Sequence, residues 1–467
     1  MSVVILLADG ARPDTLAAAI DAGHLPALSR LRDDGGLFTV TSCFPSVTGP
    51  AYAPFLMGRF PGPIGLPGLR WFDRSRTACS GPDHTRSYVG HQIRALDRDL
   101  ATDAPTIFEL CASSLGALQV IGRGLPATQR IGAITPRSAL RAAVTHFTGN
   151  VRGWLDIDRE VSARVVRRVR DERPEFVFAA FVGVDKISHA VGQQSHLLLD
   201  ALRIVDDTAA SIRRDAEQRG DWDDLSLWIA SDHGHSPVRW HEDLARLVAS
   251  QGFRTIAHPW VFTPRPEVAV MVSGNAMAHL YLELQRRDRP TWPGLSARWS
   301  ELLDMLLARE SVDLAILPRD DGAEVRSARD GTAYIRRQRN AFSYHTRSGD
   351  PLGIGGDLLC VTADEAYALT SRTDYPDSIV QIAHLASSPR SGDIILSASR
   401  DWDFRARYEP IPHVSSHGAL HRDHMLVPLL LNRPPAAAPR RTVDVMPSAL
   451  SALRKAVPAG LDGESFI

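Results

Sequence analysis

Four apolar runs along the chain have the length and the β-branched or aromatic content of strands that are buried on both faces. They are Val3 to Ala8, Phe176 to Val184, Leu225 to Ala230 and Met425 to Leu431. Runs of this kind are typical of parallel sheets, whose two faces are both covered by helices. The pattern therefore predicts a mostly parallel sheet built from segments far apart in the sequence.

Helical stretches lie between these runs, for instance Arg159 to Glu172 and His196 to Arg219. Alternating strands and helices indicate a doubly wound α/β fold. In such folds ligands bind beyond the carboxyl ends of the strands. The first three runs lead into Asp9, Asp185 and Asp232, so these carboxylates fall where an active site is expected.

The segment between Trp240 and Pro412 has a different pattern. Short strand-like pieces at Ala278 to Glu283, Thr332 to Arg336 and Asp393 to Ser397 stand among turns rich in Gly, Asp and Arg. We predict a catalytic core made of residues 1–240 and 413–467, with a small insertion at about residues 66–101. Residues 241–412 are predicted to form an inserted α+β cap lobe.

Composition narrows the class of partner. The 467 residues are 44% hydrophobic and 23% charged, as in globular proteins. The net charge is -1 and no long basic run occurs, so the sequence shows no positively charged surface for binding nucleic-acid polymers or anionic membranes. A small-molecule substrate is therefore expected. The run Val3 to Ala8 is too short for a signal sequence or a membrane span. The oligomeric state stays open.

The four cysteines, Cys43, Cys79, Cys111 and Cys360, lie far apart and have no metal-ligand spacing. In a chain of this size they argue against a disulfide framework. Reduced thiols in the cytoplasm are the expectation.

A set of aspartates and histidines at the predicted strand ends suggests metal binding. Asp185 and His189 would share one face of a helix that starts at the strand end. Asp232 and His233 can face one ion if the backbone turns at Gly234. Taken singly, such residues are more often turns, caps or buried histidines, but clustered carboxylates repel one another unless cations neutralise them. The predicted ligands are Asp9, Asp185, His189, Asp232, His233 and His417, a set of oxygens and nitrogens that suits Zn²⁺ or Mn²⁺.

Thr48 is the candidate nucleophile. It precedes Pro50, which suits the first position of a short apolar helix running to Met57. Free amides at a helix start favour an anion, and metal coordination lowers the pKa of a hydroxyl enough to make it a nucleophile. The alternative reading of an isolated threonine here is an ordinary helix cap.

In their order and spacing these motifs resemble the type I phosphodiesterase and nucleotide pyrophosphatase family of the alkaline-phosphatase superfamily. The resemblance covers about residues 1–65, 175–240 and 414–452. It implies an alkaline-phosphatase-like fold with inserted cap lobes and two divalent metals. One metal would be held by Asp185, His189 and His417, and the other by Asp9, Asp232, His233 and the Thr48 oxygen. The implied reaction passes through a phospho-threonine at Thr48.

The sequence also departs from the family pattern. Residues 63–73 contain no asparagine where the family often has one to hold a phosphate oxygen. Arg70 could replace it with a bidentate fork, and Lys186 is a second candidate cation, although a surface arginine is the alternative. His235 stands where the family commonly has methionine. We expect His235, His421 and His424 to support the site or the fold rather than to bind metal.

Rival activities stay open within the same fold. Cys43 begins a sulfatase-like C-x-P-x-R motif, but Val47 occupies the arginine position, and a mutase would use serine as its nucleophile. Phosphomonoesterase and phosphonate hydrolase activities fit the same metals, and a degenerate, non-catalytic ligand-binding member is the non-enzyme alternative. Apolar residues beside the single Arg70 favour a diester substrate, namely Leu66, Leu69, Trp71 and Phe72. We therefore predict a phosphodiesterase.

Overall fold

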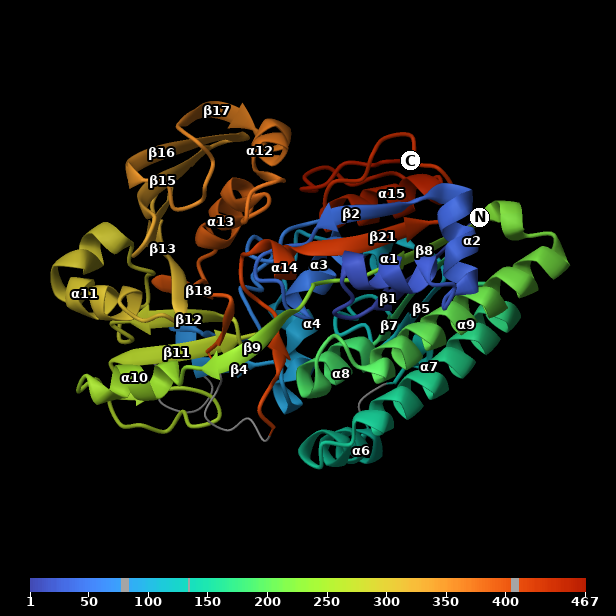
Figure 1. The fold of residues 1–467 in the computed structure, drawn as a ribbon, viewed down its shortest axis with the longest axis horizontal. Coiled ribbons are helices and arrows are strands. Elements are labelled where there is room, and N and C mark those ends of the chain that lie inside the picture. The colour runs from blue at the N-terminus through green and yellow to red at the C-terminus, as the bar shows by residue number, and fades with distance from the viewer. Residues whose placement is uncertain (77–83, 133–134, 405–410) are drawn as a thin grey trace.

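The computed structural model describes residues 1–76, 84–132, 135–404 and 411–467. A central sheet of seven strands has the order β2-β21-β8-β1-β7-β5-β6 (Figure 1). Its strands are β1 (Ser2–Ala8), β2 (Leu37–Thr41), β5 (Ser114–Ala117), β6 (Arg130–Ile131), β7 (Phe176–Phe181), β8 (Leu225–Ala230) and β21 (Leu426–Leu431). The neighbours from β8 to β6 run parallel. The mostly parallel α/β sheet predicted from the sequence is confirmed.

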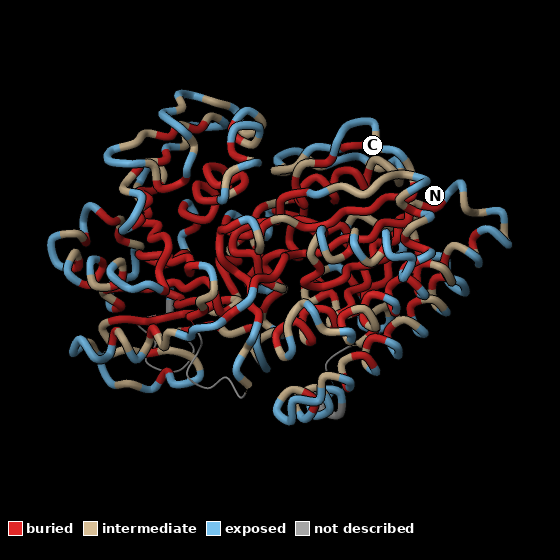
Figure 2. Tube along the Cα trace, in the orientation of Figure 1, coloured by how far each residue is buried: buried red, intermediate tan, exposed pale blue. Residues whose placement is uncertain are grey.

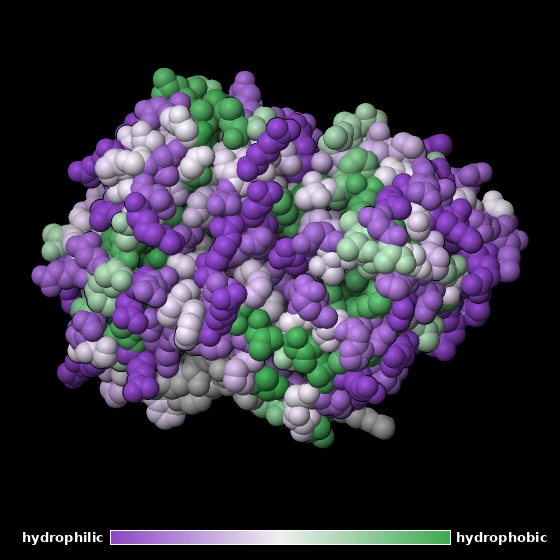
Figure 3. All heavy atoms as spheres, in the orientation of Figure 1, coloured by the Kyte–Doolittle hydropathy of each residue, from purple (hydrophilic) through white to green (hydrophobic). Residues whose placement is uncertain are grey.

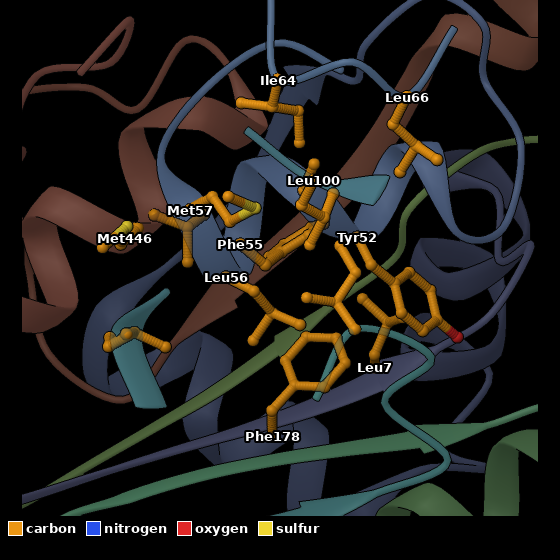
Figure 4. Packing of buried hydrophobic residues seen from close by; sticks show 14 of the residues in the cluster. Leu7, Tyr52, Phe55, Leu56, Met57, Ile64, Leu66, Leu100, Phe178 and Met446 are labelled. Carbon is orange, nitrogen blue, oxygen red and sulfur yellow. The ribbon is translucent and has the colours of Figure 1, made fainter. Parts of the chain in front are cut away.

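Helices cover both faces of this sheet because alternate side chains of each strand point to opposite faces. Val4 and Leu6 of β1 pack in a cluster with α1 (Pro13–Asp21), α2 (Pro26–Gly35), α7 (Val151–Glu172) and α9 (His196–Arg219). Leu7 packs on the other face, where α3 (Ala53–Met57) and α15 (Val445–Ala452) lie. Figure 4 shows this second cluster, in which Phe55 and Met446 lie over the sheet together with Leu7.

Two predicted elements differ from the structure. The run ending at Val184 is a strand only to Phe181, because α8 (Gly183–Val191) begins almost at once. The last apolar run forms β21, which is antiparallel to both β8 and β2 rather than parallel. An apolar run carries no mark of direction, so its composition could not reveal this.

A second sheet of nine strands lies beside the first (Figure 1). In spatial order its strands are β10 (Thr255–Ile256), β11 (Val268–Ser273), β12 (Met277–Leu282), β18 (Ile394–Ala398), β13 (Val312–Arg319), β14 (Gly322–Ser327), β15 (Gly331–Gln338), β16 (Ala341–Gly349) and β17 (Leu358–Thr362). Its helices are α10 (Leu244–Ser250), α11 (Trp292–Leu307), α12 (Ala363–Thr370) and α13 (Ser378–Ala386). The predicted short strands correspond to β12, β15 and β18. The exact division of the chain into core and lobe stays a prediction.

The two sheets are joined by shared packing. One hydrophobic cluster combines Cys43 and Phe44, which precede Thr48, with Ile382 of α13 and Tyr344 of β16. Gln381 of α13 accepts from the Phe44 amide at 2.9 Å and donates to the Ser42 carbonyl at 3.0 Å. Figure 2 shows buried chain in both halves of the molecule. The second sheet therefore supports the segment that carries the candidate nucleophile.

A small sheet also bridges the halves, in the order β19-β9-β20. Its strands are β9 (Ser236–His241), β19 (Asp401–Asp403) and β20 (Ser415–Ser416). The remaining elements include the hairpin β3 (Arg70–Phe72) and β4 (Thr85–Ser87), and the helices α4 (Leu96–Asp99), α5 (Ile107–Leu110), α6 (Pro136–Phe147) and α14 (Arg422–Met425).

The face in Figure 3 is mainly hydrophilic, with smaller hydrophobic areas. In the part of the chain that the structure describes, no helix is long and apolar enough to cross a membrane. Cys43, Cys111 and Cys360 are free thiols, whereas Cys79 lies outside the described residues.

Candidate metal centre

The carboxyl ends of β1, β7 and β8 meet at one edge of the central sheet, and the predicted aspartates meet there too. Asp9 follows β1, and its neighbour Gly10 has a φ of +75°, a conformation that glycine adopts without strain. Asp185 lies in the first turn of α8, and its Oδ1 is 3.1 Å from Nε2 of His189 one turn later. The predicted pairing of these two residues on one helix face is what the structure has.

One group of possible ligands consists of Asp9, Asp232 and His233, all buried and each offering an atom within 4.8 Å of the others. His233 Nε2 lies 3.3 Å from Asp9 Oδ1 and 3.5 Å from Asp232 Oδ2. Gly234 lets this turn form, because a Cβ there would come within 2.2 Å of the Asp423 carbonyl oxygen.

Thr48 faces this first group. Its Oγ1 is 3.2 Å from Asp9 Oδ1 and 3.1 Å from His233 Nε2. The chain turns directly afterwards into a 3₁₀ turn, Pro50–Tyr52, and then α3. The predicted helix start at Pro50 is confirmed, but α3 has only five residues. The surrounding side chains, more than a helix dipole, set the charge around Thr48.

A second group contains Asp185, His233, His235 and His417, whose ligand atoms also lie within 4.8 Å of one another. His417 Nε2 is 3.5 Å from Asp185 Oδ1, and His235 Nε2 is 2.9 Å from the same oxygen. His189 is not one of these four, although it contacts Asp185. The structure thus brings His235, which we expected only to support the site, as close to Asp185 as the predicted ligands.

Hydrogen bonds to Nδ1 of each predicted histidine ligand determine which ring nitrogen can bind a cation. Nδ1 of His189 lies 2.8 Å from the Ser415 carbonyl, that of His233 3.1 Å from the Gly234 carbonyl and that of His417 3.0 Å from the Ser46 carbonyl. A carbonyl only accepts, so each Nδ1 carries the proton and each Nε2 can offer a lone pair to a cation. This arrangement is common among metal-binding histidines.

The electrostatics of the buried carboxylates also fit a cation. Burial and the charge of Asp9 raise the pKa of the Asp232 carboxyl well above its usual range. Burial opposes ionisation of Asp185, but His189 and Lys186 outweigh it and hold the pKa of that carboxyl well below its usual range. Among the described residues, Asp232 Oδ2 has no hydrogen-bond partner. A divalent cation would satisfy this oxygen and offset the charge of the carboxylates.

Burial and neighbouring charges shift the pKa values of two histidines in opposite directions. Burial lowers the pKa of His233, but Asp232 and Asp9 outweigh it and raise that pKa to about 9. Burial, with His233 nearby, holds the pKa of His417 well below its usual range. Cation binding at His233 would therefore release a proton, as expected for metal sites.

The predicted substrate cations line a pocket of about 390 Å³ that opens beside Thr48. Lys186 Nζ donates to Asp185 Oδ2 at 2.8 Å, and Arg70 Nη1 donates to the Val272 carbonyl at 3.0 Å. Of the apolar residues expected near the substrate, only Leu69 lines the pocket. Leu66, Trp71 and Phe72 are buried in the hydrophobic core instead, because the β3–β4 hairpin packs against it.

Sequence reasoning missed several residues of the site. Tyr52 donates its hydroxyl to Asp9 Oδ2 at 3.1 Å from one turn beyond Thr48. Asn275, at the β11–β12 turn, and His413 line the pocket, and their side chains lie 2.9 Å apart. The i+4 spacing from Thr48 could have identified Tyr52, whereas no local signal identifies Asn275.

Solved structures confirm the architecture. A phosphonoacetate hydrolase from Sinorhizobium meliloti 1021, in complex with phosphonoformate, has a TM-score of 0.58 at 16% identity, over 97% of this chain and 96% of that one. Human ectonucleotide pyrophosphatase/phosphodiesterase 5 has a TM-score of 0.59 at 14% identity, over 99% and 97%. Its murine counterpart, as an inactive variant in complex with AMP, has 0.55 at 14%, over 98% and 96%. No curated protein matches by sequence.

The α/β fold and the buried cluster of carboxylates and imidazoles define a metal-dependent hydrolase of phosphoric esters with alkaline-phosphatase-like architecture. The model of the type I phosphodiesterase / nucleotide pyrophosphatase family matches residues 3–422. The chain belongs to that family, as its motifs indicated.

Proposed function

We propose that the protein is a two-metal phosphodiesterase in which Thr48 attacks phosphorus. The observation that carries the proposal is the position of Thr48 Oγ1, which lies within hydrogen-bonding distance of Asp9 and His233 in the wall of the pocket. One metal would be held by Asp185, His189 and His417, and the second by Asp9, Asp232, His233 and Thr48. The inactive murine variant carries a threonine-to-alanine substitution, which agrees with a threonine nucleophile.

Two Zn²⁺ or Mn²⁺ ions bound there would lower the pKa of the threonine hydroxyl and neutralise phosphoryl oxygens. Thr48 Oγ1 donates to Asp9 Oδ1, so Asp9 orients the hydroxyl and can take its proton. As the Oγ–phosphorus bond forms, the bond from phosphorus to the leaving oxygen breaks, and that oxygen takes up a proton from water as the alcohol leaves. A water oxygen then attacks phosphorus, the phosphorus–Oγ bond breaks, and the phosphate monoester leaves while Thr48 Oγ1 regains a proton from Asp9.

The pocket supports a diester as substrate. Apolar side chains form much of its wall, among them Leu69, Val89, Ile93, Val120 and Trp154. A diester carries one negative charge and a second organic group that such a wall can contact, whereas a monoester presents a dianion that needs more positive charge. Lys186 and Arg70 are the cations of the wall, and both already donate to protein oxygens.

The test compares kcat/KM for bis(p-nitrophenyl) phosphate, p-nitrophenyl phosphate and phosphonoacetate on metal-loaded enzyme. We expect the diester to be the best substrate. A diester-to-monoester ratio below one rejects the diesterase assignment, and preferential turnover of phosphonoacetate identifies a phosphonate hydrolase.

Thr48→Ala should retain the fold and lose roughly three orders of magnitude or more in turnover, because the covalent route is gone. Thr48→Ser, which keeps a hydroxyl, is the matched control and should retain much more activity. Near wild-type turnover by Thr48→Ala, or the absence of phosphate on Thr48 in quenched wild-type enzyme, would show that Thr48 is not the nucleophile.

A further inference from the structure

His235 is placed at the metal centre by strand pairing. It directly precedes β9, which pairs antiparallel with β20 through Ser236 opposite Ser416. One step further in that register, His235 stands opposite His417. Both side chains are buried, with exposed fractions of 0% and 4%, so each imidazole is enclosed by the site.

The two ring nitrogens of His235 have different neighbours. Nδ1 lies 3.1 Å from Ser415 Oγ, which in turn lies 2.9 Å from the Ser236 carbonyl oxygen. Nε2 lies 2.9 Å from Asp185 Oδ1, and both residues belong to the group whose ligand atoms lie within 4.8 Å of one another. In the tautomer that carries its proton on Nδ1, Nε2 offers a lone pair on the side of Asp185, where a cation would satisfy both atoms.

The three rings around Asp185 also have the spacing of ligands to one ion. Ring centroids are 4.8 Å apart for His189 and His235, 5.0 Å for His189 and His417, and 5.1 Å for His235 and His417. Two imidazoles bound through Nε2 to one tetrahedral ion have centroids about 5 Å apart. His233 instead stacks on His417 at 3.7 Å with an interplanar angle of 9°, which suits two rings that face separate ions.

We propose that His235 binds, through Nε2, the metal that Asp185 and His417 hold. The inference rests on the proposed metal sites. With the ligands proposed above, this centre would have one carboxylate and three imidazoles, from Asp185, His189, His235 and His417. Four such ligands would complete a tetrahedral shell, so a substrate oxygen would have to be a fifth ligand. The centre should therefore favour ions that readily accept five or six ligands.

The direct test is anomalous diffraction from crystals of the wild-type protein loaded with Zn²⁺ or Co²⁺. A His235 Nε2 to metal distance of about 2.1 Å supports the inference. A metal bound by Asp185 and His417 with His235 Nε2 beyond about 3 Å overturns it and leaves the proposed function intact. No metal at either site overturns the metal-based function as well, and with it this inference.

Variants give an independent readout of binding rather than of activity. Zn²⁺ affinity, measured by competition with a chelator, should fall more than about 100-fold at one site in His235→Ala. His235→Gln keeps an N–H that can donate to Asp185 but offers a poor ligand, so it should lose affinity equally if His235 binds the metal. Rescue of affinity by His235→Gln would instead assign a positioning role and overturn the inference. His241→Ala, at the far end of β9 and outside the site, is the control and should bind as wild type does.

Discussion

At the scale of single residues, Tyr52 shows how a buried hydroxyl can tune the site without reaching the substrate. Its hydroxyl donates to Asp9 Oδ2, and burial, with the charge of Asp9, raises its pKa well above the usual range, so it stays a donor. Its ring packs at 5.3 Å against Phe178 in the core. The ring thus serves stability, and the hydroxyl serves Asp9.

Tyr52→Phe should therefore fold normally while Asp9 loses one of its fixed contacts. We expect metal affinity and kcat/KM to fall by roughly 10-fold to 100-fold, as for other groups that orient metal ligands. Metal titration and steady-state kinetics measure both. Tyr281→Phe removes a similar buried hydroxyl, bonded to the Arg390 carbonyl, and is the matched control. If the two variants lose metal affinity and kcat/KM equally, the effect of Tyr52→Phe is general destabilisation and not the loss of the contact with Asp9.

Three of the candidate ligands could be predicted from the sequence because each follows a recognisable strand end. Asp9, Asp185 and Asp232 share one geometric rule, that parallel strands end at a common edge, and the structure brings them together there. Asn275 and His413 obey no such rule. They lie at the pocket because of how the second sheet packs and where the chain runs after it, and both depend on contacts between segments far apart in the sequence. His235 was visible as a histidine, but its distance from Asp185 was not.

At the scale of secondary structure elements, the contact between α7 and α8 holds two candidate ligands in place. Asp158 of α7 is fully buried, and its carboxyl accepts from the amides of Val182, at 3.1 Å, and Gly183, at 2.7 Å. Those two amides lie at the start of α8, the helix that carries Asp185 and His189. Burial raises the pKa of Asp158 to about 7 in spite of both hydrogen bonds.

This pKa shift predicts a pH dependence of stability. The unfolded carboxyl titrates near pH ~3.9, so between about pH 4 and 7 the folded state binds more protons than the unfolded state. The free energy of unfolding contributed by Asp158 is therefore greatest at low pH and declines as the pH rises through that window. Asp158→Asn removes the decline, and its Tm relative to wild type should rise from pH 5 to pH 8.

Thermal unfolding of both proteins at several pH values measures this difference, and Asp156→Asn, an exposed aspartate on the same helix, is the control. Parallel Tm curves for wild type and Asp158→Asn would mean that Asp158 is ionised throughout that range.

The sequence could not predict the direction in which β21 runs in the central sheet. Its apolar composition matches that of β1 and β8, yet it enters the sheet antiparallel to β8 after the chain returns from the second sheet. The start of α8 at Gly183 was equally hidden within an apolar run, although the spacing of Asp185 and His189 predicted a helix there.

At the scale of the whole molecule, the candidate ligands come from segments of the chain that lie far apart in the sequence and also pack against one another. His417 follows β20. Its carbonyl accepts from the Ala276 amide in the β11–β12 turn, and its Nε2 lies 3.5 Å from Asp185 Oδ1 of α8. The second sheet is therefore more than a cover over the site, because the β11–β12 turn contacts His417 and helix α13 contacts Phe44. The sequence predicts an inserted lobe, and that division stays a prediction, but nothing in the sequence indicates that the second sheet shares a hydrophobic cluster with Phe44.

Metal removal should consequently weaken the whole fold, not the site alone. Without cations, Asp9, Asp185 and Asp232 remain buried beside one another, and the stabilisation from bound metal, about 4 kcal/mol at a thousandfold excess over Kd, is lost. We expect elemental analysis to find two divalent ions per chain and chelation to lower Tm by several degrees, with faster hydrogen exchange in residues 231–236 and 413–418.

Asp232→Asn removes one of the repelling carboxylates, so its Tm should change less on chelation. An unchanged Tm and full activity in excess chelator, with no metal by elemental analysis, would contradict both the metal sites and their part in holding the two sheets together.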